Sequence, residues 1–117
     1  TCVCAGLSGD LLCLGGRHGH VQLFDLARSD QPIWTTLVHG SWCDSLIVED
    51  GLVFTTSADR KLVLLDQATG NRHATFGPFP TRPQSVQVDA EAVLLVGPDG
   101  LVIRMPRKDT LPAPVRN

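Results

Sequence analysis

The residues of this sequence that come closest to a chemical motif are two histidines separated by one residue, His18 and His20. Two imidazoles at alternate positions of a strand or turn bind a metal ion when further ligands join them. No carboxylate or third histidine stands at a recurring spacing from this pair, because His39 and His73 fall in other segments. We therefore interpret His18 and His20 as exposed turn residues, and we expect neither a metal site nor a cofactor.

The other candidate motifs for catalysis are incomplete. The glycine-rich stretch at 15–19 lacks the Lys-Ser/Thr ending and the following helix of a phosphate-binding loop. No Gly-x-Ser-x-Gly motif marks a serine nucleophile. The adjacent carboxylates Glu49 and Asp50 would point to opposite faces of a strand, and Asp50-Gly51 is better interpreted as a hairpin turn. The sequence therefore predicts no catalytic residue and no enzyme.

Composition limits the remaining classes of function. The chain has 117 residues, 43% hydrophobic, and a formal charge of −2, which gives no long-range field to attract nucleic acid or acidic membranes. No apolar run is long enough to span a membrane. The four cysteines fall in the first half of the chain and are interpreted as reduced thiols, which favours a cytoplasmic or nuclear location. Because the sequence begins with Thr1, we expect it to be a piece of a longer protein.

The elements that must position any site are short strands. Apolar runs of four to six residues, rich in Val and Leu, alternate with turns that contain Gly, Pro, Asp or Ser, and no window has a sustained helical period. Fully apolar runs such as 62–65 indicate strands that are buried on both faces. The predicted strands are 2–5, 11–14, 21–26, 33–38, 45–49, 52–56, 62–65, 72–76, 85–89, 93–96 and 101–105.

An internal repeat organises these strands. The segment from Leu11 to Leu26 aligns without gaps to the segment 41 residues later, so that Asp25 corresponds to Asp66. A third copy begins at Val93 and is one residue shorter in its turn. Each copy reads as strand, tight turn and strand, with a further strand before it. Four strands in roughly 40–45 residues is the spacing of propeller blades.

At these residues the sequence resembles the WD40-repeat family of β-propellers. Phe24-Asp25 and Leu65-Asp66 stand where that family has Trp-Asp, and Ser57-Ala58-Asp59 resembles its Ser-x-Asp. His39-Gly40 lies near the family's Gly-His with the order reversed, and Gly97-Pro98-Asp99 is a weaker copy of the turn. Both copies lack the Trp, and His18 replaces the turn Asp in the first. We therefore do not expect the complete Asp–His–Ser–Trp hydrogen-bonded set that braces a typical blade.

A second propeller family remains an alternative. The stretch from Leu65 to Gly70 resembles the Leu-Asp-x-x-Thr-Gly segment of blades that bind pyrroloquinoline quinone, and Trp34 would then be a blade-docking tryptophan. That resemblance implies a fragment of a quinoprotein-type enzyme or cofactor-binding protein. It also implies acidic and aromatic groups at the axis that hold a quinone and calcium, and the sequence offers none.

The resulting prediction is an all-β chain with about two and a half propeller blades of four-stranded antiparallel sheets. The blades are expected at about 1–40, 41–80 and 81–106, followed by an extended or disordered tail at 107–117. The resemblance implies that the rest of the propeller belongs to the parent chain and supplies the strand that completes the last blade. The stretch alone is then expected to be marginally stable or prone to aggregate, because it leaves open sheet edges.

The loops that share one face of such a propeller are the predicted binding surface. The resemblance implies a scaffold that binds protein partners without catalysis, including the substrate receptors of ubiquitin ligases of the F-box type with WD repeats. A loop Trp among basic residues has the composition of an interface hot spot, although Trp42 packed between blades is the alternative. The predicted partner-binding residues are Arg17, His18, Trp42, Arg60, Lys61 and Arg82. The predicted turn and blade residues are Asp25, Ser57, Asp59, Asp66, Asp99 and Gly100.

Overall fold

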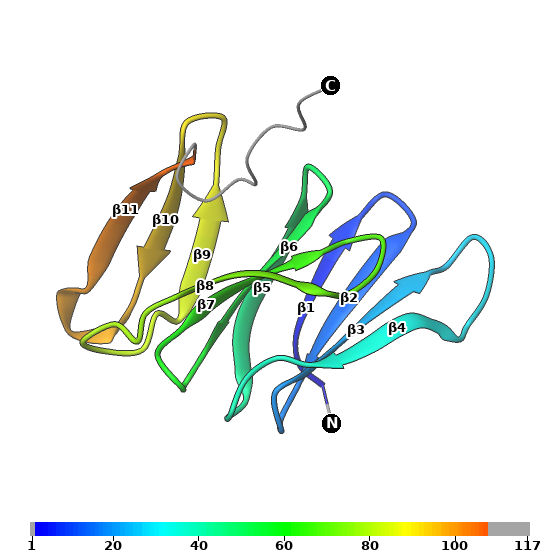
Figure 1. Ribbon diagram of the computed structural model, residues 1–117, viewed down its shortest axis with the longest axis horizontal. Coiled ribbons are helices and arrows are strands. Elements are labelled where there is room, and N and C mark those ends of the chain that lie inside the picture. The colour runs from blue at the N-terminus through cyan, green and yellow to red at the C-terminus, as the bar shows by residue number, and fades with distance from the viewer. Residues whose placement is uncertain (1, 108–117) are drawn as a thin grey trace.

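The computed structural model describes residues 2–107, and these residues form three antiparallel sheets that stand side by side (Figure 1). The first sheet has the strand order β1-β2-β3-β4 and the second has β5-β6-β7-β8, so each sheet is a simple meander. The third sheet has three strands in the order β11-β10-β9. The fold is therefore all-β and has the blade arrangement that the repeat predicts.

The strands lie close to the expected segments. The first sheet contains β1 (Cys2–Ser8), β2 (Leu11–Gly16), β3 (His20–Asp25) and β4 (Pro32–Leu37). The second contains β5 (Cys43–Glu49), β6 (Leu52–Ser57), β7 (Leu62–Asp66) and β8 (Arg72–Phe76). The third contains β9 (Ser85–Val88), β10 (Ala92–Val96) and β11 (Val102–Pro106), and a short 3-10 turn, η1 (Pro98–Gly100), joins its last two strands.

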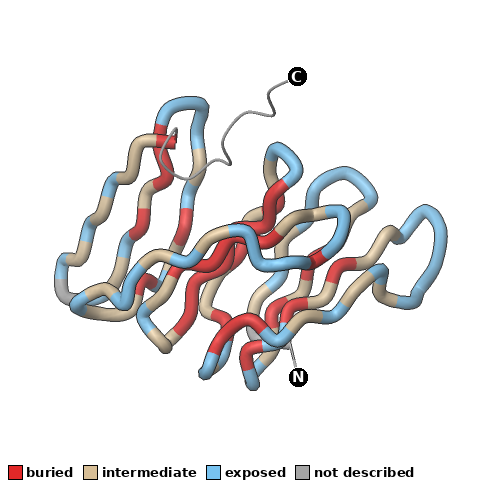
Figure 2. The backbone as a smooth tube through the Cα atoms, in the orientation of Figure 1, coloured by how far each residue is buried: buried red, intermediate tan, exposed pale blue. Residues whose placement is uncertain are grey.

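The second sheet lies at the centre of the fold because both of its faces are covered. All six residues of β6 and the first four of β7 are buried (Figure 2). Along β7 the side chains alternate between the neighbours: Val63 and Leu65 belong to the cluster shared with the first sheet, whereas Leu62 and Leu64 belong to the cluster shared with the third. This alternation follows from the two-residue period of a strand. It confirms the expectation that the 62–65 run is buried on both faces.

Each outer sheet has one face that the described residues leave uncovered. On the first sheet Leu7, Ile33 and Leu37 are 68%, 51% and 60% exposed. On the third sheet Val102 is 65% exposed. Large apolar side chains exposed on one face of a sheet are typical of a contact surface. In a propeller, this is the surface on which the next blade packs.

The end of the third sheet is attached to the second by a buried arginine. Arg107 is 6% exposed, donates to the backbone carbonyl of Asp89 at 2.6 Å and forms an ion pair with Asp50. Arg107 is the first residue of the segment predicted to be a tail, and residues 108–117 of that segment lie outside the described residues. Within the described part of the chain, no helix is long and apolar enough to cross a membrane.

Candidate functional site

Five connections gather at one end of the three sheets, which we call the loop end (lower part of Figure 1). In an antiparallel meander every second connection lies at the same end of the strands. The loop end therefore contains the β2–β3 turn, the β4–β5 connection, the β6–β7 turn, the β8–β9 connection and the η1 turn. These connections contain all the residues that the sequence predicts as partner-binding.

Backbone hydrogen bonds join these connections into one surface. The amide of Val38 donates to the Gly19 carbonyl at 2.9 Å, which fixes the β2–β3 turn to the β4–β5 connection. The Ala58 amide donates to the Trp42 carbonyl at 3.4 Å. The Phe79 amide donates to the Arg60 carbonyl at 2.7 Å, which fixes the β8–β9 connection to the β6–β7 turn. The loop end is thus held by contacts between segments distant in sequence.

A tryptophan and an arginine form an ordered polar cluster on this surface. The guanidinium carbon of Arg82 lies 5.2 Å from the centre of the Trp42 ring. Arg82 also donates to both carboxylate oxygens of Asp44, at 2.6 and 3.2 Å, and the indole Nε1 of Trp42 donates to Asp44 Oδ1 at 2.9 Å. Trp42 is 39% exposed, so its ring lies at the surface. The cluster links the second and third sheets and presents an aromatic ring whose orientation is already set.

The β6–β7 turn presents Arg60 and positions Lys61. The turn closes through the Arg60 amide, which donates to the Ser57 carbonyl at 3.0 Å. The Ser57 hydroxyl accepts from the Asp59 amide at 3.1 Å, and Asp59 Oδ1 accepts from the Lys61 amide at 3.1 Å. Arg60 is exposed and has a positive φ of 69°, whereas Lys61 is half-buried. Ser57 and Asp59 thus shape the turn that carries the two bases.

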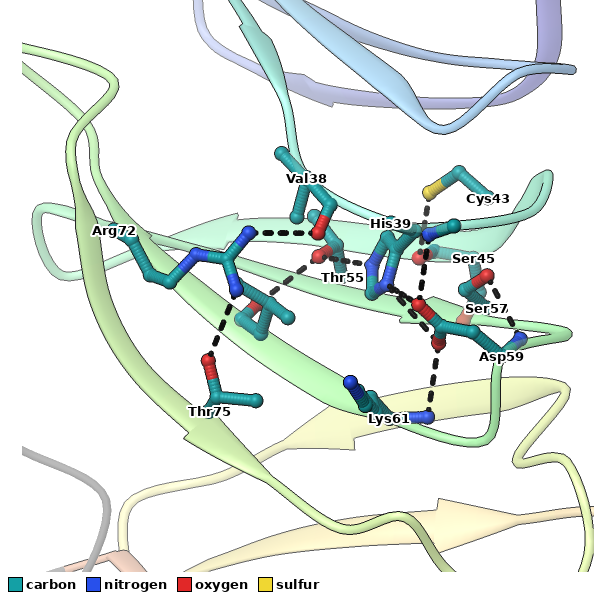
Figure 3. Close-up of polar contacts among 12 residues, drawn as sticks. Val38, His39, Cys43, Ser45, Thr55, Ser57, Asp59, Lys61, Arg72 and Thr75 are labelled. Atoms are coloured by element: carbon teal, nitrogen blue, oxygen red, sulfur yellow. Dashed lines mark hydrogen bonds and ion pairs between the residues drawn. The ribbon is translucent and has the colours of Figure 1, made fainter.

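A buried histidine supports this turn from the interior of the protein (Figure 3). His39 is 3% exposed; its Nδ1 lies 3.0 Å from Asp59 Oδ2, and its Nε2 lies 2.8 Å from the Thr55 hydroxyl. The Gly40 amide donates to the same Asp59 oxygen at 3.1 Å. Burial lowers the pKa of His39, an effect that the neighbouring Asp59 carboxylate partly opposes. We did not expect the complete Asp–His–Ser–Trp set, and the second sheet has it without the tryptophan. Thr55 supplies the hydroxyl, and the loop brings His39 to Asp59 although the order of Gly and His is reversed.

The remaining predicted residues have separate positions. Arg17 and His18 are exposed in the β2–β3 turn, and with His20, Gln22 and Thr35 they line a cavity on the uncovered face of the first sheet. Across residues 2–107, no group of three or more His, Cys, Asp or Glu side chains lies together as a metal site would require. Gly100 has a positive φ of 79° at the end of η1, and Asp99 lies within that turn.

Asp25 and Asp66 lie at the other end of the sheets, where they close the outer turns. Asp25 Oδ1 accepts from the Ala27 amide at 3.1 Å. Asp66 Oδ1 accepts from the amides of Ala68 and Thr69 at 2.8 and 3.2 Å. The two aspartates occupy equivalent positions of the repeat, and each accepts from the amide two residues further along the chain. Their role is local, since each holds the turn that follows its own strand.

Two residues that join distant segments, Asp44 and Arg72, have no signal in the sequence. Asp44 binds Arg82 across 38 positions of chain, and Arg72 donates to the Val38 carbonyl at 2.9 Å across 34. Trp34 donates from Nε1 to the Gln67 carbonyl at 2.8 Å and covers Gly70. This is the docking position that the quinone-binding resemblance implies for Trp34. The contact is structural, because it joins the first sheet to a turn of the second.

Three cysteines lie where the first two sheets meet: Cys13 and Cys43 are buried, and Cys4 is half-buried. Cys43 Sγ lies 3.3 Å from Cys4 Sγ, and both lie close to Gly15, where a Cβ would overlap them. Burial raises the pKa of Cys13 to about 12, and the contact with Cys4 together with burial also raises the pKa of Cys43. Cys13 and Cys43 are thus packing residues rather than nucleophiles.

Comparisons with known proteins identify the fold. No model of a known protein family matches this sequence, and no curated protein does. Among solved structures, Sqt1 of Saccharomyces cerevisiae superposes with a TM-score of 0.75 at 15% identity, over 91% of this chain and 32% of that one. A chain of the mitotic checkpoint complex superposes with a TM-score of 0.72 at 16% identity, over 80% of this chain and 30% of that one. The fold is that of a WD40-like propeller, and this chain spans about a third of the length of the chains it matches.

Proposed function

We propose that this chain is a protein-interaction module without catalytic activity, and that its loop end binds a segment of a partner protein. The observation that carries the proposal is the surface cluster of Trp42, Arg82 and Asp44. Trp and Arg are the residues most often found as hot spots of protein interfaces. Because the cluster is already ordered by its own hydrogen bonds, less conformational entropy is lost when a partner binds.

The fold supports this assignment in general terms. One of the similar solved chains is part of the mitotic checkpoint complex, so a chain of this fold takes part in a protein assembly. We extend this kind of role to the present chain. Its narrower form is recognition of a substrate for a ubiquitin ligase in the cytoplasm. This form predicts that the bound partner is ubiquitylated when it is mixed with the parent protein of this segment and a ubiquitin ligase.

The uncovered faces of the outer sheets are a second, structural interface. Leu7, Ile33 and Leu37 on the first sheet and Val102 on the third are too exposed and too apolar for a surface that faces only water. We infer that further propeller blades cover both faces. This interface completes the fold, whereas the loop end remains open to a partner because it lies at the ends of the strands rather than on their faces.

The test is a selection of short random peptides on the full chain, by which we mean this segment within its parent protein, where further blades cover the outer sheets. We expect the selected peptides to lose binding when Trp42→Ala is combined with Arg60→Glu, because both side chains are exposed at the loop end. Arg28→Glu, at the other end of the sheets, is the matched control and should leave binding unchanged, since Arg28 is exposed there with a side chain 85% accessible. Arg82 is left intact, because its removal would leave the Asp44 carboxylate without its ion pair.

Two results would contradict the proposal. In the first, the selected peptides bind the double variant as well as the original chain. In the second, the double variant unfolds, which would show that Trp42 and Arg60 are structural residues rather than binding residues. A circular dichroism melt of each variant, recorded beside the binding measurement, separates these two results.

A further inference from the structure

We propose that the segment bound at the loop end is acidic, and that Arg60 is the residue that selects it. This inference rests on the proposed function and adds to it the chemistry of the partner. Its basis is the separation of charge between the two ends of the sheets and the backbone conformation of Arg60. The two observations are independent, because the first concerns all the connections and the second concerns one residue.

The two ends of the sheets carry opposite charge. At the loop end the bases are Arg17, Arg60, Lys61 and Arg82. The turns at the other end carry the exposed acidic residues Asp10, Asp30, Asp50, Asp89 and Glu91. They also carry Arg28, and Asp50 is paired with Arg107, so acidic residues predominate at that end. The net charge of −2 hides this separation, because it averages the two ends. A surface of one sign attracts a segment of the opposite sign and repels others, which gives specificity.

The acidic side chains described at the loop end are already engaged. Asp44 accepts from Arg82 and from the Trp42 indole, and its side chain is only 8% exposed. Asp59 accepts from two backbone amides and lies against His39. Asp99 also lies at this end, within η1. Arg60, by contrast, is exposed, and it lies on the turn that is hydrogen-bonded to the connection carrying Trp42.

The repeat provides an internal comparison for Arg60. The equivalent residue of the first copy is Gly19, with a φ of 89°, and that of the third copy is Gly100, with a φ of 79°. All three turns therefore require the left-handed conformation, which Gly adopts freely and which strains residues with a Cβ. Only the middle copy places an arginine there, at a φ of 69°. A residue kept in a strained conformation indicates a function for its side chain.

The position of Arg60 is fixed by its neighbours. Its amide donates to Ser57 and its carbonyl accepts from Phe79, so the backbone of this residue is held on both sides. The connection that contains Phe79 also carries Arg82, and the turn that contains Arg60 is bonded to Trp42 through Ala58. Arg60 and Arg82 therefore stand on neighbouring, hydrogen-bonded segments, and Trp42 lies on a third segment that is bonded to the turn of Arg60. An exposed arginine on a segment next to the Arg82–Trp42 pair suits a peptide that combines carboxylates with apolar side chains.

The experiment compares Arg60→Gly with Arg28→Gly. The first substitution restores the residue found in the other two copies, so we expect the melting temperature to stay constant or rise. The peptides selected on the full chain are each remade with Gln in place of every Glu and Asn in place of every Asp. Fluorescence anisotropy then measures the affinity of the full chain for both versions of each peptide. We expect the neutral version to bind about tenfold more weakly, and Arg60→Gly to reduce that difference, while Arg28→Gly leaves it unchanged.

The possible results separate this inference from the proposed function. If selected peptides require Trp42 but bind equally well after neutralisation, the loop end is a binding surface and the acidic preference is wrong. If no selected peptide depends on Trp42, both proposals fail. If single-stranded oligonucleotides or vesicles of anionic lipid bind more tightly than the acidic peptides, with the same dependence on Arg60, the partner is not an acidic peptide and this inference is overturned.

Discussion

Replacement of Asp59 by alanine tests the support beneath the loop end. The Asp59 carboxylate accepts from the Gly40 amide at 3.1 Å and from the Lys61 amide at 3.1 Å, and it lies 3.0 Å from Nδ1 of His39. The alanine variant loses all three interactions and leaves the His39 nitrogen buried without its partner. At about 1 kcal/mol net for each hydrogen bond, and more for a buried donor without a partner, the free energy of unfolding should fall by roughly 2–4 kcal/mol.

The assay is urea unfolding of the full chain, followed by tryptophan fluorescence. Two variants calibrate the result. Asp59→Asn keeps one acceptor oxygen and should cost about half as much as the alanine variant. Asp66→Ala removes the equivalent turn aspartate of the other end, which accepts from two amides in an exposed turn, and should cost about 1 kcal/mol.

One result would refute this reasoning directly. If Asp59→Ala lowers stability no more than Asp66→Ala does, the buried contact with His39 contributes nothing beyond the closure of a turn. The description of His39 and Asp59 as a brace for the second sheet would then be wrong. Equal effects of the alanine and asparagine variants would show instead that the charge of Asp59, rather than its hydrogen bonds, is the stabilising feature.

Four further predictions concern stability, packing and assembly. The pKa of His39 is lowered in the folded state. Its contribution to stability should therefore be fully present above the unfolded pKa of 6.5 and should be lost as the pH decreases through the folded pKa. In melts recorded at several pH values, His39→Gln should remove this pH dependence, and an unchanged dependence would assign it to another group. Gly70→Ala should lower the free energy of unfolding in urea by about 2–3 kcal/mol, because a Cβ there would lie 2.4 Å from the Trp34 ring and the residue has a φ of 77°. Gly9→Ala is the control, because a Cβ there meets nothing within 4 Å and should add only backbone strain. Equal costs would show that Trp34 does not contribute. Because burial raises the pKa of Cys13 to about 12, iodoacetamide at about pH 8 should modify it only after denaturation, and rapid modification of the native chain, detected by mass spectrometry, would contradict its packing role. Because apolar faces of the outer sheets are uncovered, the isolated 117-residue chain should associate with rising concentration in analytical ultracentrifugation, and a monomer with a sharp cooperative melt would contradict this expectation.

The sequence predicts the strands and their order because these depend on neighbouring residues. Short Val- and Leu-rich runs separated by turn residues define strands, and the repeat groups them into sheets. The apolar run at 62–65 even indicates that the second sheet is covered on both faces. Asp25 and Asp66 are likewise recognisable, since each bonds to amides only two or three residues away.

The tertiary structure alone decides which distant residues meet. His39 reaches Asp59 across 20 positions, and Arg82 reaches Asp44 across 38. Such pairs depend on the twist of each sheet and on how neighbouring sheets pack, neither of which has a period in the sequence. The same holds for the three left-handed turns: the repeat aligns Arg60 with two glycines, but only the backbone angles show that the arginine occupies a conformation that suits glycine. The sequence thus determines the blades, whereas the packing between them determines the surface that they present.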